Sequence, residues 1–496
     1  DVCSSDLTSR IVLESLGIED YGIYNLVGGI VTIFAFLNSA MIATSQRFIS
    51  YELGKGNLHK LKDVFCTTLT IHIAIAFIIV VLSEVIGVWF LNTKLNIPSD
   101  RMMAANWTLQ LSIFVFAVNV ISVPYNASIV AHEKMSAFAY ISIFEVSLKL
   151  AIAYLLLFIS YDKLIVYSIL VFCVALLLRS LYCFYCKRHF EECHYTFSFN
   201  IEQFREMFAF AGWSLVGNLG FSFKDQLSNI LLNLFFGTVV NAARGISVQV
   251  GSLINSFSAN FMMAMNPQIT KSYAVGDLYR SKELVYAGCR FSFYLLAVIS
   301  LPIMINITYI LNLWLVEVPQ YTDIFLILTI VCNLLYAISS PLTTAMQATG
   351  RIKWFQVIIC IVMLTELPIA YLLLSIGYPP YSVLYASLFV TLLGVLIRIV
   401  LISRILPIYE IRYYVTHIFS KNILIVFITY CIAYILHKKM EQDSFFTAVL
   451  SSFILELILF SLAYLCGLSS TERYVVNQKL VTILESKRRK NKQKNI

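Results

Sequence analysis

The chain has 496 residues, of which 59% are hydrophobic and 13% charged, and its formal net charge is +8 at pH 7. The apolar residues fall in repeated blocks of about 20 residues, the length that a helix needs to cross a bilayer. No long polar segment separates these blocks, so the composition excludes a soluble protein and predicts an all-α polytopic membrane protein.

The predicted spans begin close to the N-terminus. The first seven residues, DVCSSDL, resemble the translation of a sequencing-adapter string, so residues 1–7 are read as an artefact and Thr8 as the start of a chain that lacks one helix. Apolar blocks then fall near residues 21–45, 64–91, 104–130, 137–160, 164–186, 204–232, 236–262, 285–312, 322–346, 354–376, 380–402, 418–438 and 444–466. By length these are 13 spans, and about 14 with the missing one.

The sequence also contains an internal repeat. Residues 121–161 align without a gap onto 338–378, and 15 of the 41 positions are identical. Upstream, GNLHKLKDV at 56–64 parallels GDLYRSKEL at 276–284, which makes the repeat unit six helices. An even number of crossings returns the chain to the same side, so the two units are expected to be parallel and related by a pseudo-twofold axis along the membrane normal.

This repeat predicts two six-helix lobes with a cleft between them. We expect a truncated N-terminal lobe at 8–190, a C-terminal lobe at 204–404, an extra helix pair at 418–466 and a basic tail at 467–496. The loops on one side, with the tail, hold 24 of the 36 Lys and Arg residues, those on the other side hold 6, and 6 lie within spans. Because positive residues are retained on the cytoplasmic side, both chain ends are expected there.

Charged residues inside spans cost about 2.5–3.5 kcal/mol each to insert, so they are candidates for function. They are Glu84, Glu145, Lys149, Arg179, Lys224, Asp225, Arg244, Arg290, Glu366, Arg398 and Glu456. Lys149 and Glu366 occupy the same register position of the two repeats. Our hypothesis is that they form an ion pair across the cleft, which acts as a gate or coupling element, and that Pro368 lets the helix beside Glu366 bend.

The alternative for Lys149 is a pair within its own helix. Glu145 precedes Lys149 by four residues, in the order that favours an i, i+4 ion pair. Reversing the charges of Lys149 and Glu366 singly and together would separate the two hypotheses, because an intrahelical pair predicts no rescue by the double reversal.

A polar stripe marks the span at 204–232. Ser214, Asn218, Ser222, Asp225 and Asn229 are spaced by 4, 4, 3 and 4, which places them on one helical face. The next span continues a polar face, and its arginine suits bidentate phosphate binding. The predicted substrate-cavity residues are Lys224, Asn218, Asp225, Asn229, Asn241, Arg244, Ser252 and Asn255. Hydrogen bonding between helices, without a substrate, is the alternative for the stripe.

Three further patterns are interpreted without a catalytic role. Arg179 and Arg398 lie toward the cytoplasmic ends of their spans and are expected to extend to the lipid headgroups. The segment CFYCKRHFEECH fits no zinc-finger spacing, so no metal site is expected. The chain has no phosphate-binding G-x-x-x-x-G-K-[ST] loop and no H-E-x-x-H helix, and we expect neither a cofactor nor an enzymatic activity.

Two long segments carry a resemblance to a known family. LGIEDYGIYNLVGGIVTIFAFLNSAMIATSQRFISYELGKGN resembles the second span of bacterial polysaccharide flippases, and FFGTVVNAARGISVQVGSLINSFSANFMMAMNPQITKSYAVGD resembles the eighth. NPQITKSYA, at 266–274, is the most specific part, and the resemblance runs from Thr8 to about residue 470.

The resemblance implies the two-lobed fold of the multidrug, oligosaccharidyl-lipid and polysaccharide exporter superfamily. It implies an undecaprenyl-pyrophosphate-linked oligosaccharide as substrate, moved from the cytoplasmic to the periplasmic leaflet of the bacterial inner membrane. The implied partners are the lipid bilayer, H⁺ or Na⁺ as coupling ion and a polysaccharide polymerase, with no nucleic acid. Two alternatives stay open: a cation-coupled multidrug exporter of the same fold, and a membrane polymerase or glycosyltransferase.

Overall fold

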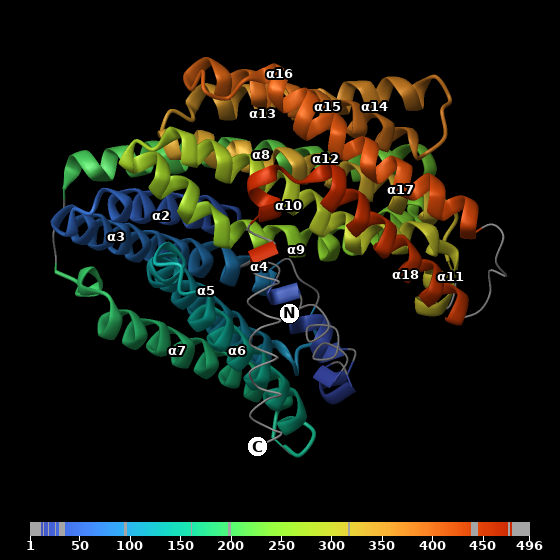
Figure 1. Cartoon of the computed structure of the whole chain (residues 1–496). Coiled ribbons are helices and arrows are strands. Elements are labelled where there is room, and N and C mark those ends of the chain that lie inside the picture. The colour runs from blue at the N-terminus through green and yellow to red at the C-terminus, as the bar shows by residue number, and fades with distance from the viewer. Residues whose placement is uncertain are drawn as a thin grey trace, which may run out of the picture. The chain divides into compact units, whose positions relative to one another are not determined.

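The computed structural model is helical throughout its regular structure (Figure 1). It describes residues 11–28 except 13, 18 and 25, and residues 35–93, 97–159, 161–196, 200–315, 318–437, 445–474 and 477–478. The adapter-like residues 1–7 and most of the basic tail lie outside the described residues.

The helices follow the predicted blocks. The first repeat contains α2 (Ala35–Lys55), α3 (Leu58–Leu82), α4 (Val88–Thr93), α5 (Met102–Ala131), α6 (Met135–Leu155) and α7 (Lys163–His189). The second contains α8 (Ile201–Phe236), α9 (Thr238–Val275), α10 (Leu278–Ile305), α11 (Ile307–Trp314), α12 (Thr322–Thr349), α13 (Lys353–Leu364), α14 (Glu366–Ser375) and α15 (Ser382–Ile405). After it come α16 (Ile411–Tyr413), α17 (Lys421–His437) and α18 (Phe445–Leu462).

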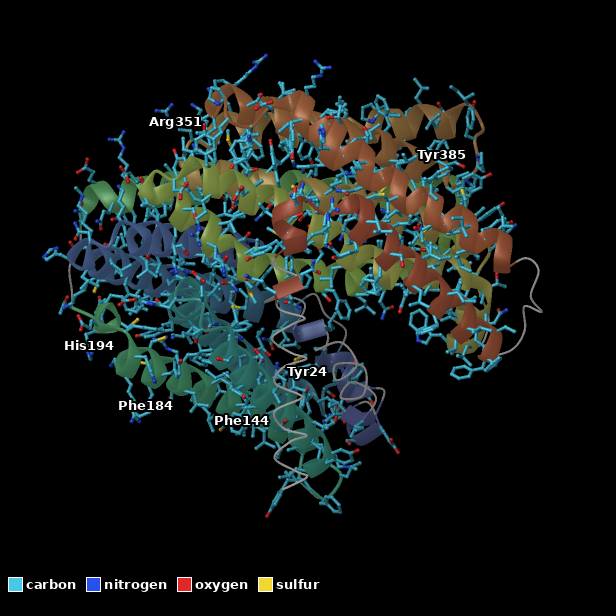
Figure 2. All side chains as sticks on the ribbon, in the orientation of Figure 1. Tyr24, Phe144, Phe184, His194, Arg351 and Tyr385 are labelled. Carbon is cyan, nitrogen blue, oxygen red and sulfur yellow. The ribbon has the colours of Figure 1, made fainter. Side chains whose placement is uncertain are left out.

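Ten spans in the described residues are long and apolar enough to cross a membrane. The helices α2, α8 and α9 are also long, but they are more polar and fall outside that set. Large apolar side chains such as those of Phe144 and Phe184 point outward from their helices (Figure 2). Outward aromatic side chains are expected where a helix faces lipid instead of water.

The described helices divide into two compact units. Unit 1 comprises Asp1–Gly220, Asn266–Asp277 and Gln347–Cys360. Unit 2 comprises Phe221–Met265, Leu278–Met346 and Ile361–Ile496. The lobe boundaries expected from the sequence, 8–190 and 204–404, stay predictions.

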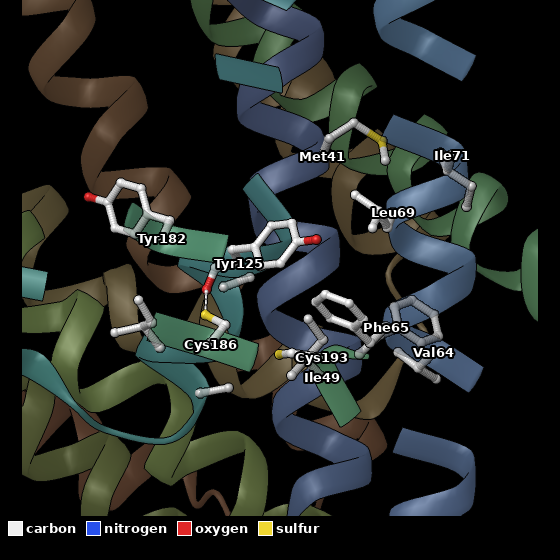
Figure 3. Packing of buried hydrophobic residues seen from close by; sticks show 14 of the residues in the cluster. Met41, Ile49, Val64, Phe65, Leu69, Ile71, Tyr125, Tyr182, Cys186 and Cys193 are labelled. Carbon is white, nitrogen blue, oxygen red and sulfur yellow. Dashed lines mark hydrogen bonds between the residues drawn. The ribbon is translucent and has the colours of Figure 1, made fainter. Parts of the chain in front are cut away.

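The core of unit 1 forms around α5. Small residues on the second half of this helix, Ala127, Ser128 and Ala131, are fully buried and allow neighbouring helices to approach closely. The ring of Phe65 on α3 meets the ring of Tyr125 edge-on at 5.3 Å between centroids. On the other side of α5, the Cys186 thiol donates a hydrogen bond to the Tyr125 carbonyl at 3.5 Å (Figure 3).

The internal repeat is visible in the backbone as well as in the sequence. Gly56 and Gly276, with φ of 70° and 88°, sit two residues before α3 and α10, respectively. Glu133 and Gly350, with φ of 59° and 75°, are equivalent positions of the 217-residue repeat and end the turns after α5 and α12. Positive φ is unusual outside glycine, so its recurrence at equivalent positions supports a common turn geometry.

Both turns make polar contacts within unit 1. The Lys271 ammonium of α9 lies 2.7 Å from Oε1 of Glu133, and the Gln268 amide donates to Oε2 at 3.1 Å. Reciprocally, the Arg47 guanidinium of α2 donates to the carbonyl groups of Gln347 and Ala348 at 3.3 Å each. We call these two sets of contacts the turn contacts, and they join segments of the first repeat to segments of the second.

The structure corrects the interpretation of two arginines. Arg179 donates to the Ile121 carbonyl at 2.8 Å, and Arg398 is 4% exposed and donates to Ser339 at 3.2 Å. The prediction that both extend to the lipid headgroups is therefore wrong. Each guanidinium finds an acceptor inside its own unit, beside the proline of α5 or α12 that interrupts the helical hydrogen bonding.

Candidate functional site

Four charged side chains meet inside unit 2. Lys224 and Asp225 come from α8, Arg244 from α9 and Glu366 from the first turn of α14. We call them the charge cluster. The Lys224 ammonium lies 3.2 Å from Oε2 of Glu366 and 3.8 Å from Oδ1 of Asp225. Two cations and two anions give the cluster a formal charge of zero, which is the condition under which such groups tolerate burial.

Glu366 is the most deeply buried member of the cluster, at 0% exposure. Besides its ion pair with Lys224, it accepts a hydrogen bond from the Ser228 hydroxyl at 3.1 Å. Sequence reasoning missed Ser228, although it follows Lys224 by four residues and so shares its helical face. A carboxylate with these two partners is held in one orientation inside the unit.

Arg244 keeps hydrogen-bonding capacity that its neighbours do not use. It is 4% exposed, and one terminal nitrogen lies 3.5 Å from Oδ1 of Asp225. Its Nε is buried and has no hydrogen-bond partner among the described residues, and the same is true of Oδ1 of Asn241, one turn earlier on α9. Buried polar atoms without a partner are uncommon in proteins, and they mark a place where a polar ligand can bind.

A break in the helix positions Glu366. α13 ends at Leu364 and α14 begins at Glu366, with Thr365 between them. Pro368 has no N–H to donate to the Leu364 carbonyl. At the break itself, the Thr365 N–H is shared between the carbonyl groups of Ile361 and Val362, at 3.1 and 3.2 Å. The interruption predicted from Pro368 is therefore present, and it lies directly beside the buried carboxylate.

The other predicted cavity residues have more varied surroundings. Asn218 donates to Ser39 at 3.1 Å within unit 1, which fits the interhelical alternative for the stripe. Ser252 bonds to the backbone of its own helix, at the Gln249 carbonyl. Asn229 and Asn255 are partly buried. Substrate contact by these residues stays a prediction.

Lys149 has a partner on its own helix. Its ammonium lies 2.6 Å from Oε1 of Glu145, which confirms the intrahelical alternative. Lys149 belongs to unit 1 and Glu366 to unit 2. Their pairing across the two units stays a prediction.

The cysteine- and histidine-rich segment is packed into unit 1. Cys186 and Cys193 are buried, and Glu192 bonds to the His132 ring at 2.6 Å. Within the described part of the chain, no group of three or more His, Cys, Asp or Glu side chains is placed to hold a metal ion.

The fold resembles that of solved membrane transporters. A MATE crystal structure in the bent conformation superposes with a TM-score of 0.68 at 12% identity, covering 81% of this chain and 92% of that one. The Vibrio cholerae MATE transporter VcmN, solved as a mutant, gives 0.67 at 14% identity, with 83% and 94% coverage. A MOP superfamily transporter from Pyrococcus furiosus, whose title describes a binding pocket of reversed polarity, gives 0.64 at 13%, with 82% and 91% coverage. These likenesses show that the chain has the fold of these transporters.

The sequence comparisons identify the family. Residues 8–273, more than half of the chain, match the family described as polysaccharide biosynthesis protein, and the chain belongs to it. Residues 214–372 also match the MatE family. The uncharacterized membrane protein EpsK of Bacillus subtilis is 19% identical over 272 residues. That match covers 54% of this chain and 53% of EpsK, so it spans about half of this curated relative.

Proposed function

We propose that the protein moves an undecaprenyl-pyrophosphate-linked oligosaccharide from the cytoplasmic to the periplasmic leaflet of the bacterial inner membrane, for assembly of a surface polysaccharide such as O-antigen. The observation that carries the proposal is the buried Arg244, whose Nε has no hydrogen-bond partner in the part of the chain that the structure describes. A guanidinium with an unused donor is suited to phosphate oxygens. Membership of a polysaccharide biosynthesis family supplies the class of substrate.

The charge cluster supports a binding and release cycle. A pyrophosphate that approaches Arg244 competes with Asp225 for the guanidinium, since the two are held at 3.5 Å and not in a close bidentate pair. The substrate anion then takes the place of Asp225 beside the guanidinium. The polyprenyl tail remains in lipid while the headgroup crosses by alternating access, and no covalent bond is made or broken.

We assign Glu366 and Lys224 to coupling. Protonation of Glu366, or its binding of Na⁺, would remove the nearer of the two acidic partners of Lys224, since the ammonium lies 3.2 Å from Glu366 and 3.8 Å from Asp225. The ammonium could then bind an anionic group of the substrate. The cross-lobe pair of Lys149 with Glu366 is a competing arrangement. It predicts that the double charge reversal at these two residues recovers transport that each single reversal abolishes.

Complementation tests the proposal. Cells that lack their own flippase are given the gene, and surface polysaccharide is scored for several repeat units. We expect recovery with the unsubstituted protein, and loss of about tenfold or more with Arg244→Ala, since one lost charge-assisted hydrogen bond is worth about 1.5–3 kcal/mol. The absence of recovery with every repeat unit would count against the proposal.

A second candidate function is cation-coupled multidrug export. The MatE match over residues 214–372 favours it. Efflux of a cationic dye such as ethidium from cells that lack their own exporters would support this function. A cavity for cationic drugs is expected to carry net negative charge, whereas the charge cluster is formally neutral.

A polymerase or glycosyltransferase would need a catalytic extracytoplasmic domain, and the predicted connections on that side are too short for one.

Both chain ends are proposed to be cytoplasmic. The distribution of Lys and Arg supports this orientation. Reporter fusions that are active on only one side of the membrane, placed after residue 478, would test it.

A further inference from the structure

Unit 1 contains a partly open cavity of about 310 Å³, and no residue of the charge cluster lines it. Five polar side chains line it: Tyr24, Asn119 on α5, Glu145 and Lys149 on α6, and Tyr167 on α7. The remaining lining is aliphatic. Ligand sites in proteins usually measure about 300–1,000 Å³, so this cavity has room for one small polar unit and not for a whole oligosaccharide.

The charges in the cavity cancel. Glu145 and Lys149 form an ion pair at 2.6 Å, so the cavity has no net charge to attract a free cation or anion. Each partner still has hydrogen-bonding positions that the pair does not use, acceptors on the carboxylate and donors on the ammonium. Such a pair suits a neutral group with several hydroxyls, which both donate and accept.

Two tyrosines form the aromatic part of the wall. The rings of Tyr24 and Tyr167 meet edge-on, with 4.9 Å between centroids and an interplanar angle of 66°. A tyrosine offers an apolar ring face together with a polar hydroxyl. A pyranose ring is complementary to this wall, because it has a face of C–H groups and a rim of hydroxyls.

Ion pairs at the end of the bundle hold Tyr24 in place. Arg101 donates to Asp20 at 2.8 Å and to Asp162, the residue before α7, also at 2.8 Å. The hydrogen bond with Asp20 raises the pKa of the Arg101 guanidinium, which stays charged. These contacts hold the segment that carries Tyr24 against the start of α7.

We propose that this cavity is a subsite for one neutral monosaccharide unit, held by the Glu145–Lys149 pair, Asn119 and the two tyrosines. The inference rests on the proposed function for the source of that sugar, a glycan carried by the substrate.

Saturation-transfer NMR tests the subsite directly. The full chain in lipid nanodiscs is titrated with glucose, galactose and N-acetylglucosamine. We expect transfer to the ring protons of at least one sugar, and about threefold to tenfold weaker binding in Tyr167→Ala, as expected for loss of an aromatic partner. Asn119→Ala is expected to weaken binding of the same sugar, and it should not affect folding because Asn119 is exposed. Tyr140→Ala is the matched control, since Tyr140 lies on α6, is 74% exposed and does not line the cavity.

Several results would overturn the inference. They are no transfer to any of the three sugars, equal weakening by Tyr140→Ala, or displacement of the bound sugar by inorganic pyrophosphate, which would indicate an anion site. Sugar binding by a protein that fails in complementation would leave the subsite standing and remove the proposed function. Complementation by a protein that binds none of the three sugars would leave the proposed function standing and remove the subsite.

Discussion

Glu366 has no exposed surface, and its carboxyl group has Lys224 and Ser228 as partners. A buried ion pair adds little net stability, because desolvation offsets most of the attraction between its members. Removing one member is costly, since the other is left as an uncompensated charge. The pair is thus poorly suited to holding the fold together and well suited to responding to a ligand or a proton.

The first prediction follows from this asymmetry. Lys224→Met should lower the free energy of unfolding by about 3–5 kcal/mol, because Glu366 loses its counter-charge. The double variant Lys224→Met with Glu366→Leu should recover most of that loss. Unfolding in detergent, followed by tryptophan fluorescence, measures both variants.

Lys149→Met is the control for this prediction. Its pair with Glu145 is partly exposed and within one helix, so its loss should cost only about 0.3–0.5 kcal/mol. If Lys224→Met is no more destabilising than Lys149→Met, the charge cluster is not energetically coupled in the way that its geometry indicates.

At the scale of elements, α13 and α14 differ from their counterpart in the first repeat. α6 runs without interruption, and Ala151 occupies the position equivalent to Pro368. The break at Thr365 is therefore present in the second repeat and not at the equivalent position of the first. It lies beside Glu366, the proposed coupling residue. An interrupted helix bends more easily than a continuous one.

The second prediction concerns Pro368. Pro368→Ala restores a donor for the Leu364 carbonyl, so it should raise the free energy of unfolding by up to about 3 kcal/mol. It should also slow transport, because the bend is lost. Ala151→Pro is the reciprocal change and should destabilise α6 by a similar amount. Unchanged transport in a stabilised Pro368→Ala protein would separate the break from function.

The turn contacts lead to the third prediction. Lys271→Glu places a second anion beside Glu133, so we expect transport to fall several-fold, with at most about 1 kcal/mol lost in stability for such a partly exposed pair. Adding Glu133→Lys should restore transport. The control is Lys134→Glu, at the neighbouring exposed position. A double reversal that transports no better than the single one would contradict a role for this pair in the transport cycle.

At the scale of the molecule, the helices after the second repeat are tied to α10. Tyr294 donates to Asn422 of α17 at 2.6 Å, and Arg290 makes a bidentate pair with Glu472, with contacts of 2.6 to 3.1 Å. Glu472 also accepts from the backbone N–H of Ser469, which in turn caps the following helical turn. The extra helix pair is therefore an integral part of unit 2.

The fourth prediction tests this attachment. Glu472→Gln leaves Arg290 buried without a carboxylate and should lower the free energy of unfolding by about 3–5 kcal/mol. Glu410→Gln is the control, because its pair with Lys282 is long, at 4.0 Å, and exposed. Thermal unfolding in detergent compares the two, and equal effects would argue against a structural role for the buried pair.

The sequence by itself determined the membrane class, the positions of the helices and the six-helix repeat. Hydropathy, helical length and an ungapped register are local or self-similar properties, so they can be read along one chain. The Glu145–Lys149 pair and the break at Pro368 were predictable for the same reason, since each depends on residues within one helix.

Only the tertiary structure decided which charges meet across helices. The sequence placed Lys224, Asp225 and Arg244 in one cavity, but the approach of Glu366 to Lys224 and Ser228 depends on how α14 packs against α8. In the same way, Arg398 is buried and does not reach lipid, because a hydroxyl on α12 lies within its reach. Partner choice between helices depends on which faces come together, and helical periodicity gives the face of each helix but not its neighbour.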